Sequence, residues 1–295
     1  MKTVLLFPGQ AAQFVGMGQD IYGSELLAKD LIDQANDILG YDLKAIMQEG
    51  PLEKLTQTIY TQPAVYVHSL AVFAVKKESQ EFHAVAGHSL GEISACVAAG
   101  VMSFEDGLKL VDKRARAMQE ACEAHPSTMA AILGMEDAQV EDICAGIEGV
   151  VPANYNCPGQ IVISGTKEGI AKAISMCQEA GARRALEIAV GGAFHSSLMA
   201  SAQESLGTFI SEVQLNDAHI PIYHNVDAAP NQDGRLIKEK LVEQVTSPVK
   251  WTATLEHLIE DGYQKFIEVG GKGKILLGML RKVSREVEAE VWREE

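Results

Sequence analysis

The chain has 295 residues, 47% of them hydrophobic, and a formal net charge of −15 at pH 7. This length predicts one large domain with a smaller companion, and the acidic balance argues against nucleic acid or an anionic membrane as the main partner. Five dispersed cysteines without C-x-x-C spacing indicate free thiols in a reducing compartment and no zinc site, so we expect a cytoplasmic protein.

The first part of the chain alternates short apolar runs with amphipathic stretches. The run over 3–7 (TVLLF) ends at Pro8-Gly9, is too short for a secretory signal, and predicts a buried strand leading into a glycine loop. Apolar spacing then predicts helices over 24–38, 62–77, 90–101 and 103–121, the last capped by Ser103, and a strand over 83–87. This alternation is typical of an α/β protein with a parallel sheet.

The middle of the chain has a different order of elements. We predict strands over 128–135, 150–156, 160–165 and 182–190, and helices over 137–147 and 167–181. The order β-α-β-β-α-β is that of the split βαβ, or ferredoxin-like, arrangement. We therefore expect a small inserted domain at 125–192, between the two parts of a large domain at 1–124 and 193–295.

The remaining residues return to the α/β pattern. We predict a helix over 195–213, a strand over 220–226, two helices within 237–262 that separate near Ser247-Pro248, and a strand, glycine turn and helix over 265–283. No segment is apolar for long enough to predict a membrane span.

The pentapeptide Gly87-His88-Ser89-Leu90-Gly91 lies between a predicted strand and a predicted helix. G-x-S-x-G in this context is the signature of a nucleophile elbow, a turn so tight that its flanking positions must be very small. The serine side chain then projects over the sheet, and the amides that open the helix face a developing negative charge. The simpler alternative is a serine that caps a helix in a glycine turn.

A serine nucleophile needs a base, and the chain offers eight histidines. His195 differs from the others because it follows the glycine-rich stretch VGGAF, where the chain returns from the predicted small domain. The residues alone leave this choice open.

Eight segments, in order, resemble one family: 5–18, 61–69, 87–92, 113–119, 154–165, 192–199, 247–252 and the glycine turn near 270–273. The chain resembles the malonyl-CoA:acyl carrier protein transacylases of bacterial fatty-acid synthesis over almost its whole length. That resemblance implies a hydrolase-like α/β domain with an inserted ferredoxin-like domain. It also implies malonyl transfer from malonyl-CoA to the phosphopantetheine thiol of acyl carrier protein through a malonyl-serine intermediate.

The resemblance assigns a role to six residues. Ser89 is the acylated nucleophile and His195 is its base and acid, with the imidazole oriented by a backbone carbonyl at Lys250 instead of by a carboxylate. The backbone amides of Gln10 and Leu90 form the oxyanion hole, and Arg114 binds the free carboxylate of the malonyl group. A planar guanidinium can bind a planar carboxylate through two hydrogen bonds. The simpler alternative is that Arg114 lies on the solvated face of a helix, as most clustered arginines do.

Further implications concern selectivity, cofactors and partners. Phe194, before His195, resembles the pattern associated with malonyl instead of methyl-branched substrates. No cofactor or metal is needed, and the expected enzyme is a monomer with malonyl-CoA and acyl carrier protein as partners. An acidic carrier needs a basic patch on this acidic chain, and the candidates are Lys113, Arg116, Arg183, Arg184, Lys272 and Lys274.

Two segments depart from the family pattern. Ala11 stands where a glycine usually follows the first glutamine, which puts the geometry of the Gln10 amide in question. The turn VGGKGK at 269–274 replaces a commoner Gly-Pro-Gly-Lys turn and lacks the sequence of a phosphate-binding loop.

Three other functions remain open at this point. A thioester hydrolase would use the same serine and histidine but would have little use for Arg114. A discrete polyketide-synthase acyltransferase would differ only in the acceptor. A non-catalytic module that binds acyl carrier protein would not depend on Ser89.

Overall fold

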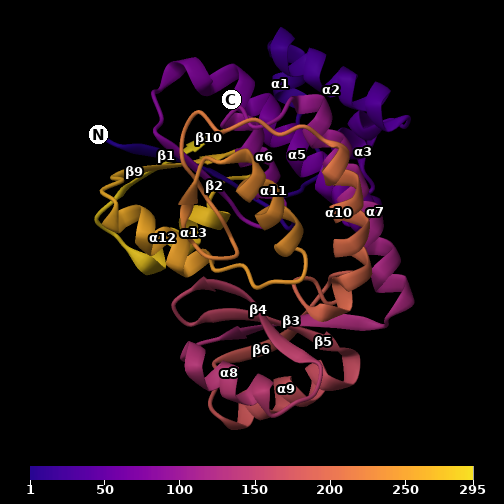
Figure 1. Cartoon of the computed structure of the whole chain (residues 1–295), viewed down its shortest axis with the longest axis vertical. Coiled ribbons are helices and arrows are strands. Elements are labelled where there is room, and N and C mark those ends of the chain that lie inside the picture. Colours follow the sequence, from indigo (N-terminus) through magenta and orange to yellow (C-terminus); the bar gives the residue numbers. More distant parts are fainter. Residues whose placement is uncertain (295) are drawn as a thin grey trace.

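The computed structural model describes residues 1–294 and contains two separate sheets (Figure 1). The larger sheet has six strands in the order β10-β9-β1-β2-β7-β8, and all neighbouring pairs are parallel except β7 with β8. Its strands are β1 (Thr3–Phe7), β2 (Ala84–Gly87), β7 (Ile222–Tyr223), β8 (Pro230–Asn231), β9 (Lys265–Val269) and β10 (Glu288–Trp292).

Helices from both ends of the chain pack around this sheet. The first group is α1 (Gln19–Ser24), α2 (Leu26–Leu39), α3 (Leu43–Glu49), α4 (Leu52–Leu55), α5 (Thr58–Lys76), α6 (Gly91–Ala98) and α7 (Phe104–Ala124), with the 3-10 helix η1 (Lys77–Ser79). The second group is α10 (Ala200–Glu212), α11 (Gly234–Glu243), α12 (Trp251–Glu260) and α13 (Ile275–Val283), with the 3-10 helix η2 (Ser197–Met199).

Strand β1 shows why the larger sheet is buried on both faces. Alternate residues of a strand point to opposite faces, and an apolar residue at every position therefore serves two cores. Leu5 and Phe7 belong to one hydrophobic cluster, while Val4 and Leu6 belong to another. The predicted parallel α/β class is confirmed.

The smaller sheet lies at one end of the molecule with two helices against it, in the lower part of Figure 1. Its strands are antiparallel in the order β4-β5-β3-β6, and its core is a third hydrophobic cluster. The elements are β3 (Ser127–Leu133), α8 (Asp137–Ala145), β4 (Val150–Cys157), β5 (Gln160–Thr166), α9 (Lys167–Glu179) and β6 (Arg184–Ile188). The predicted β-α-β-β-α-β order is confirmed, and we propose that 125–192 form an inserted domain.

Several predicted elements were too long, and two of them show why. The helix expected to begin at His195 begins at Ala200, because His195 lies in the left-handed region with φ of 58°, outside any helix. The strand expected over 220–226 is confined to β7, because the next residues turn and pair elsewhere: the His224 amide bonds to Ala229 and the Asn225 amide to Glu92. Among residues 1–294, no helix is both long and apolar enough to cross a membrane.

Candidate active site

The predicted elbow is built as a strand, a three-residue turn over 88–90 and a helix. Ser89 follows β2 and has φ of 51°, a left-handed conformation that is unfavourable for a serine. A Cβ atom on Gly87 would lie 2.0 Å from the Gly91 carbonyl oxygen, and one on Gly91 would lie 2.0 Å from the Phe7 carbonyl oxygen. Only glycine fits at either position, so the backbone closes tightly enough to project the serine.

His195 meets Ser89 although 106 positions separate them in sequence. Its Nε2 lies 2.8 Å from Ser89 Oγ, and both residues line one cavity. Its Nδ1 lies 2.9 Å from the backbone carbonyl oxygen of Gln244, which can only accept a hydrogen bond. Nδ1 therefore carries the proton, and Nε2 is left free to accept the proton of the Ser89 hydroxyl.

The assignment of the orienting carbonyl to Lys250 was wrong. The Lys250 carbonyl accepts hydrogen bonds from the amide and hydroxyl of Thr254, and the Lys250 amide bonds to Asn225. These bonds belong to the start of α12, where the first carbonyls are taken up by the helix itself. Gln244, just after α11, is free to supply its carbonyl because the helix ends there.

Burial, followed by the positive charge of Arg114, lowers the pKa of His195 to about 3, although the Gln244 carbonyl acts in the opposite direction. The imidazole is thus neutral, and able to accept a proton, well below the ordinary histidine pKa.

We therefore expect kcat/KM for malonyl-CoA to change less than about twofold between pH 7.5 and 5.5, since a base of ordinary pKa near 6.5 would lose about tenfold at pH 5.5. The measurement is initial rate at low substrate in this range, with circular dichroism confirming that the protein stays folded. A midpoint near pH 6.5 would contradict the lowered pKa.

Arg114 is a buried cation on α7, 2% exposed, and it points at the serine. Its guanidinium donates to Ser89 Oγ at 3.0 Å, to Gln62 Oε1 at 2.7 Å and to Gln244 Oε1 at 3.0 Å. Burial lowers the pKa of Arg114 to about 10, and the negative charge of Glu92 opposes this effect, so the group stays protonated at neutral pH. Its partners within residues 1–294 are neutral, which leaves its charge available to an anionic substrate.

Two backbone amides face the same cavity. Gln10 and Leu90 both line it, and within residues 1–294 neither amide donates a hydrogen bond to another backbone group. The two segments are in close contact, because a Cβ atom on Gly9 would lie 2.4 Å from the His88 carbonyl oxygen and 3.7 Å from Leu90 N. Two such amides beside a nucleophile are suited to bind an oxyanion.

Ala11, where the chain departs from the family pattern, has φ of 86°. An L-residue in this region costs about 1–2 kcal/mol, because Cβ crowds the following carbonyl oxygen. We expect Ala11→Gly to raise the free energy of unfolding by about 1 kcal/mol, the relief of strain outweighing the added freedom of the unfolded chain. Urea unfolding measures the change. Ala12→Gly is the control, since Ala12 is buried and outside the left-handed region, and it should destabilise.

The cavity around the serine has a volume of about 440 Å³. It combines polar groups with an apolar wall drawn from the strands of the smaller sheet and from helices α7 and α13. Phe194 is buried and contributes to that wall. Its role in selectivity for malonyl stays a prediction. The apolar residues that line the cavity are Ala11, Leu90, Met118, Met129, Ala131, Val162, Ile188, Ala189, Val190, Phe194, Ile275, Leu276 and Met279.

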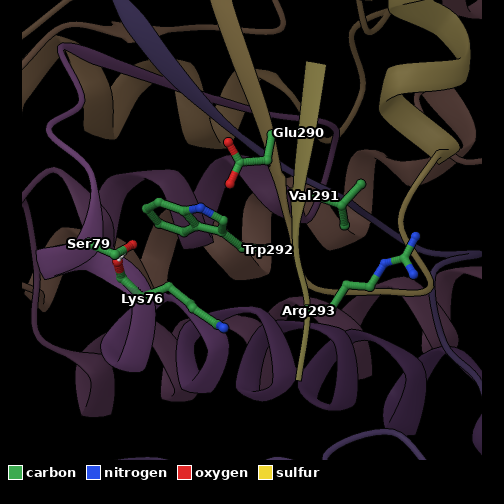
Figure 2. Close-up of a pocket in the computed structure, with 6 residues that line it drawn as sticks. All are labelled: Lys76, Ser79, Glu290, Val291, Trp292 and Arg293. Carbon is green, nitrogen blue, oxygen red and sulfur yellow. Dashed lines mark hydrogen bonds between the residues drawn. The ribbon is translucent and has the colours of Figure 1, made fainter. Parts of the chain in front are cut away.

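A second hollow, of about 520 Å³, lies beside β10 and the end of α5 (Figure 2). Figure 2 shows Trp292 and Glu290 on the strand side, with Lys76 and Ser79 opposite. Glu290 is already paired with Lys265 at 2.7 Å, and none of the six lining residues is a histidine or cysteine that could activate a nucleophile. The candidate catalytic residues Ser89 and His195 line the other cavity and not this hollow.

Sequence reasoning missed three residues that hold the site together. Asn225 Oδ1 accepts the Ser89 amide at 2.7 Å, and its Nδ2 donates to the Gly87 carbonyl at 2.7 Å, which fixes the elbow. Gln62 and Gln244 hold Arg114. The segments TQPAVYVHS and IPIYHNV contain Gln62 and Asn225, but an amide side chain in a helix or after a strand carries no pattern that predicts its partner.

A serine hydroxyl at an elbow, a neutral histidine against it and free amides beside it define an enzyme that transfers acyl groups. The chain matches the acyl transferase domain family over residues 4–289.

Named relatives and solved structures are more specific. A malonyl CoA-acyl carrier protein transacylase of Bacillus subtilis (strain 168) is 44% identical over 293 residues, which cover 97% of this chain and 92% of that protein. An acyl carrier protein S-malonyltransferase of Vibrio cholerae superposes with a TM-score of 0.94 at 39% identity, covering 99% of this chain and 96% of that one. A malonyl-transacylase in complex with its type II PKS acyl-carrier protein has a TM-score of 0.94 at 35% identity, covering 99% and 96%. The chain belongs to the malonyl CoA-acyl carrier protein transacylases.

Proposed function

We propose that this enzyme transfers the malonyl group of malonyl-CoA to the phosphopantetheine thiol of acyl carrier protein, and so loads the carrier for fatty-acid synthesis. One observation carries the proposal: Ser89 Oγ lies 2.8 Å from His195 Nε2 and 3.0 Å from the Arg114 guanidinium. A nucleophile, a base and a group that binds carboxylates thus meet at one atom.

In the first half-reaction, Ser89 Oγ attacks the thioester carbonyl while His195 Nε2 takes its proton. The amides of Gln10 and Leu90 hold the oxyanion of the tetrahedral intermediate, and each donor is worth about 3–4 kcal/mol of barrier. When the intermediate collapses, the C–S bond breaks and the imidazolium returns the proton to the CoA sulfur. The malonyl group remains as an ester on Ser89, and its carboxylate replaces neutral partners of Arg114.

In the second half-reaction, the carrier's thiol enters the same cavity. His195 takes the thiol proton, the sulfur attacks the ester carbonyl, and the C–O bond to Ser89 breaks as the imidazolium reprotonates Oγ. Bonds and protons balance in both half-reactions with the groups named here.

Carrier docking and location are further parts of the proposal. Lys272 and Lys274 are exposed just before the cavity-lining Ile275, which suits an acidic carrier, whereas Arg116 is already paired with Asp112 at 2.8 Å. We expect a modest affinity that falls with ionic strength. All five cysteines are free, which is consistent with a cytoplasmic enzyme.

The test is mass spectrometry of the protein after incubation with malonyl-CoA alone. We expect a stable malonyl adduct on the peptide that contains Ser89, none on Ser89→Ala, and transfer of the adduct when phosphopantetheinylated fatty-acid carrier is added. Release of CoA with free malonate and no adduct would instead show a thioester hydrolase. An adduct that transfers only to a polyketide carrier would instead show a polyketide-synthase acyltransferase.

A further inference from the structure

A carboxylate is buried behind the catalytic serine, outside the substrate cavity. Glu92 is in the first turn of α6, fully buried, and is not among the residues that line the cavity. Its Oε2 accepts Gln244 Nε2 at 2.7 Å and the Asn225 amide at 3.1 Å, and its Oε1 lies 2.5 Å from His224 Nδ1. Three N–H groups are thus directed at this one carboxylate.

His224 does not cancel this charge. It is fully buried, and its Nε2 has no hydrogen-bond partner within the described residues. A protonated imidazole would leave a charged N–H donor unsatisfied there, which costs more than an unpaired neutral acceptor. His224 is therefore neutral, with its proton on Nδ1 facing Glu92, and the pair carries a net charge of −1.

Gln244 connects Glu92 to Arg114 and to His195. The side-chain amide of Gln244 donates to Glu92 and accepts from Arg114, and its backbone carbonyl accepts from His195 Nδ1. The other titratable groups near this arrangement are His88, which interacts with His195, Cys96, which interacts with Glu92, and Asp227, which interacts with His224. Asp227 is paired with Lys240. Burial lowers the pKa of His88 and raises that of Cys96, so neither group carries charge at neutral pH.

We infer that Glu92 is a positioning residue that supplies the site's balancing negative charge and acts through Gln244, whose backbone carbonyl holds His195 Nδ1 where a catalytic triad would have its acid. It offsets the Arg114 cation in the resting enzyme. Once the malonyl carboxylate has paired with Arg114, the charge of Glu92 is left to stabilise the imidazolium that forms on His195. The inference rests on the proposed function.

This charge balance separates the binding of substrate from its reaction. Without the negative charge at Glu92, the resting site would carry an unbalanced Arg114, which attracts an anionic substrate more strongly. The imidazolium of the transition state would lose an attractive partner. Loss of the charge should therefore lower kcat without raising KM. Loss of a purely structural contact would instead disturb the geometry of the site and raise KM.

Glu92→Gln tests the inference, because a glutamine can keep all three hydrogen bonds. Its oxygen can accept from Gln244 and Asn225, and its amide can donate to His224 Nδ1 if the imidazole proton moves to Nε2. We expect kcat to fall on the order of tenfold or more and KM for malonyl-CoA to fall, with the malonyl-Ser89 adduct still forming slowly.

Two matched variants serve as controls. Glu92→Asp keeps the charge and should recover most of kcat. Ser94 lies on the same helix and is fully buried, and its hydroxyl has no hydrogen-bond partner within the described residues. Ser94→Ala should therefore leave kcat and KM unchanged. Unchanged kcat in Glu92→Gln, or a raised KM whatever the change in kcat, would overturn the inference. Absence of any adduct in the parent enzyme would overturn the proposed function instead.

If Glu92→Gln does not fold, the double variant Glu92→Gln with Arg114→Gln decides the question. Removal of both charges relieves the imbalance, so the double variant should fold. Failure of the double variant to fold would assign Glu92 a structural role alone.

Discussion

Replacing His195 with alanine is expected to slow formation of the malonyl-serine adduct by about 10⁴-fold, near the upper end of what a general base contributes. Ser89 Oγ–H donates to His195 and receives a hydrogen bond from Arg114. Without the imidazole, a buried hydroxyl beside a cation has nowhere to send its proton, and the leaving CoA sulfur loses its acid. Rapid-quench mass spectrometry under single-turnover conditions measures the adduct directly.

His125→Ala is the control for that experiment, because His125 is exposed just after α7, away from the cavity-lining residues. Its adduct rate should match the parent enzyme. Added imidazole should partly restore the rate of His195→Ala if the variant leaves an accessible space next to Ser89. A His195→Ala rate within tenfold of the parent would show that another group accepts the proton.

The elbow could be predicted because its determinants are local. Gly87 and Gly91 must be glycine for steric reasons, and they flank the serine within five residues. The β-α-β-β-α-β order was equally accessible, since each element has its own hydrophobic period. The alternating edge strand β10 was missed because it is short and half exposed, with a pattern that many loops share.

The base was harder to identify because it comes from the far end of an inserted segment. Nothing near His195 in sequence indicates Ser89; their contact depends on the path of the chain through β6 and the glycines that follow. The error at Lys250 has a related cause. Any residue can supply a backbone carbonyl, so the orienting carbonyl is determined by where α11 ends and α12 begins. It belongs to Gln244, six residues before the predicted Lys250.

Arg114→Ala is expected to lower kcat/KM for malonyl-CoA by about 10²- to 10³-fold, because an anion in this cavity then has no cationic partner and a buried unpaired charge costs about 3–5 kcal/mol. The same substitution should not lower kcat/KM for acetyl-CoA, which has no carboxylate and leaves the guanidinium of the parent enzyme without an anion. The ratio of the two values therefore measures selectivity, and initial rates of CoA release with each substrate supply it.

Arg116→Ala is the matched control, since Arg116 lies two residues along the same helix but is exposed and paired with Asp112. An exposed pair of this kind contributes about 0–1 kcal/mol, so both substrates should keep their parent rates. Equal losses for malonyl-CoA and acetyl-CoA in Arg114→Ala would mean that the guanidinium acts on Ser89 Oγ, which it also contacts, and not on the substrate carboxylate. A loss confined to malonyl-CoA would place the carboxylate at Arg114 and make that one buried cation the source of acyl selectivity.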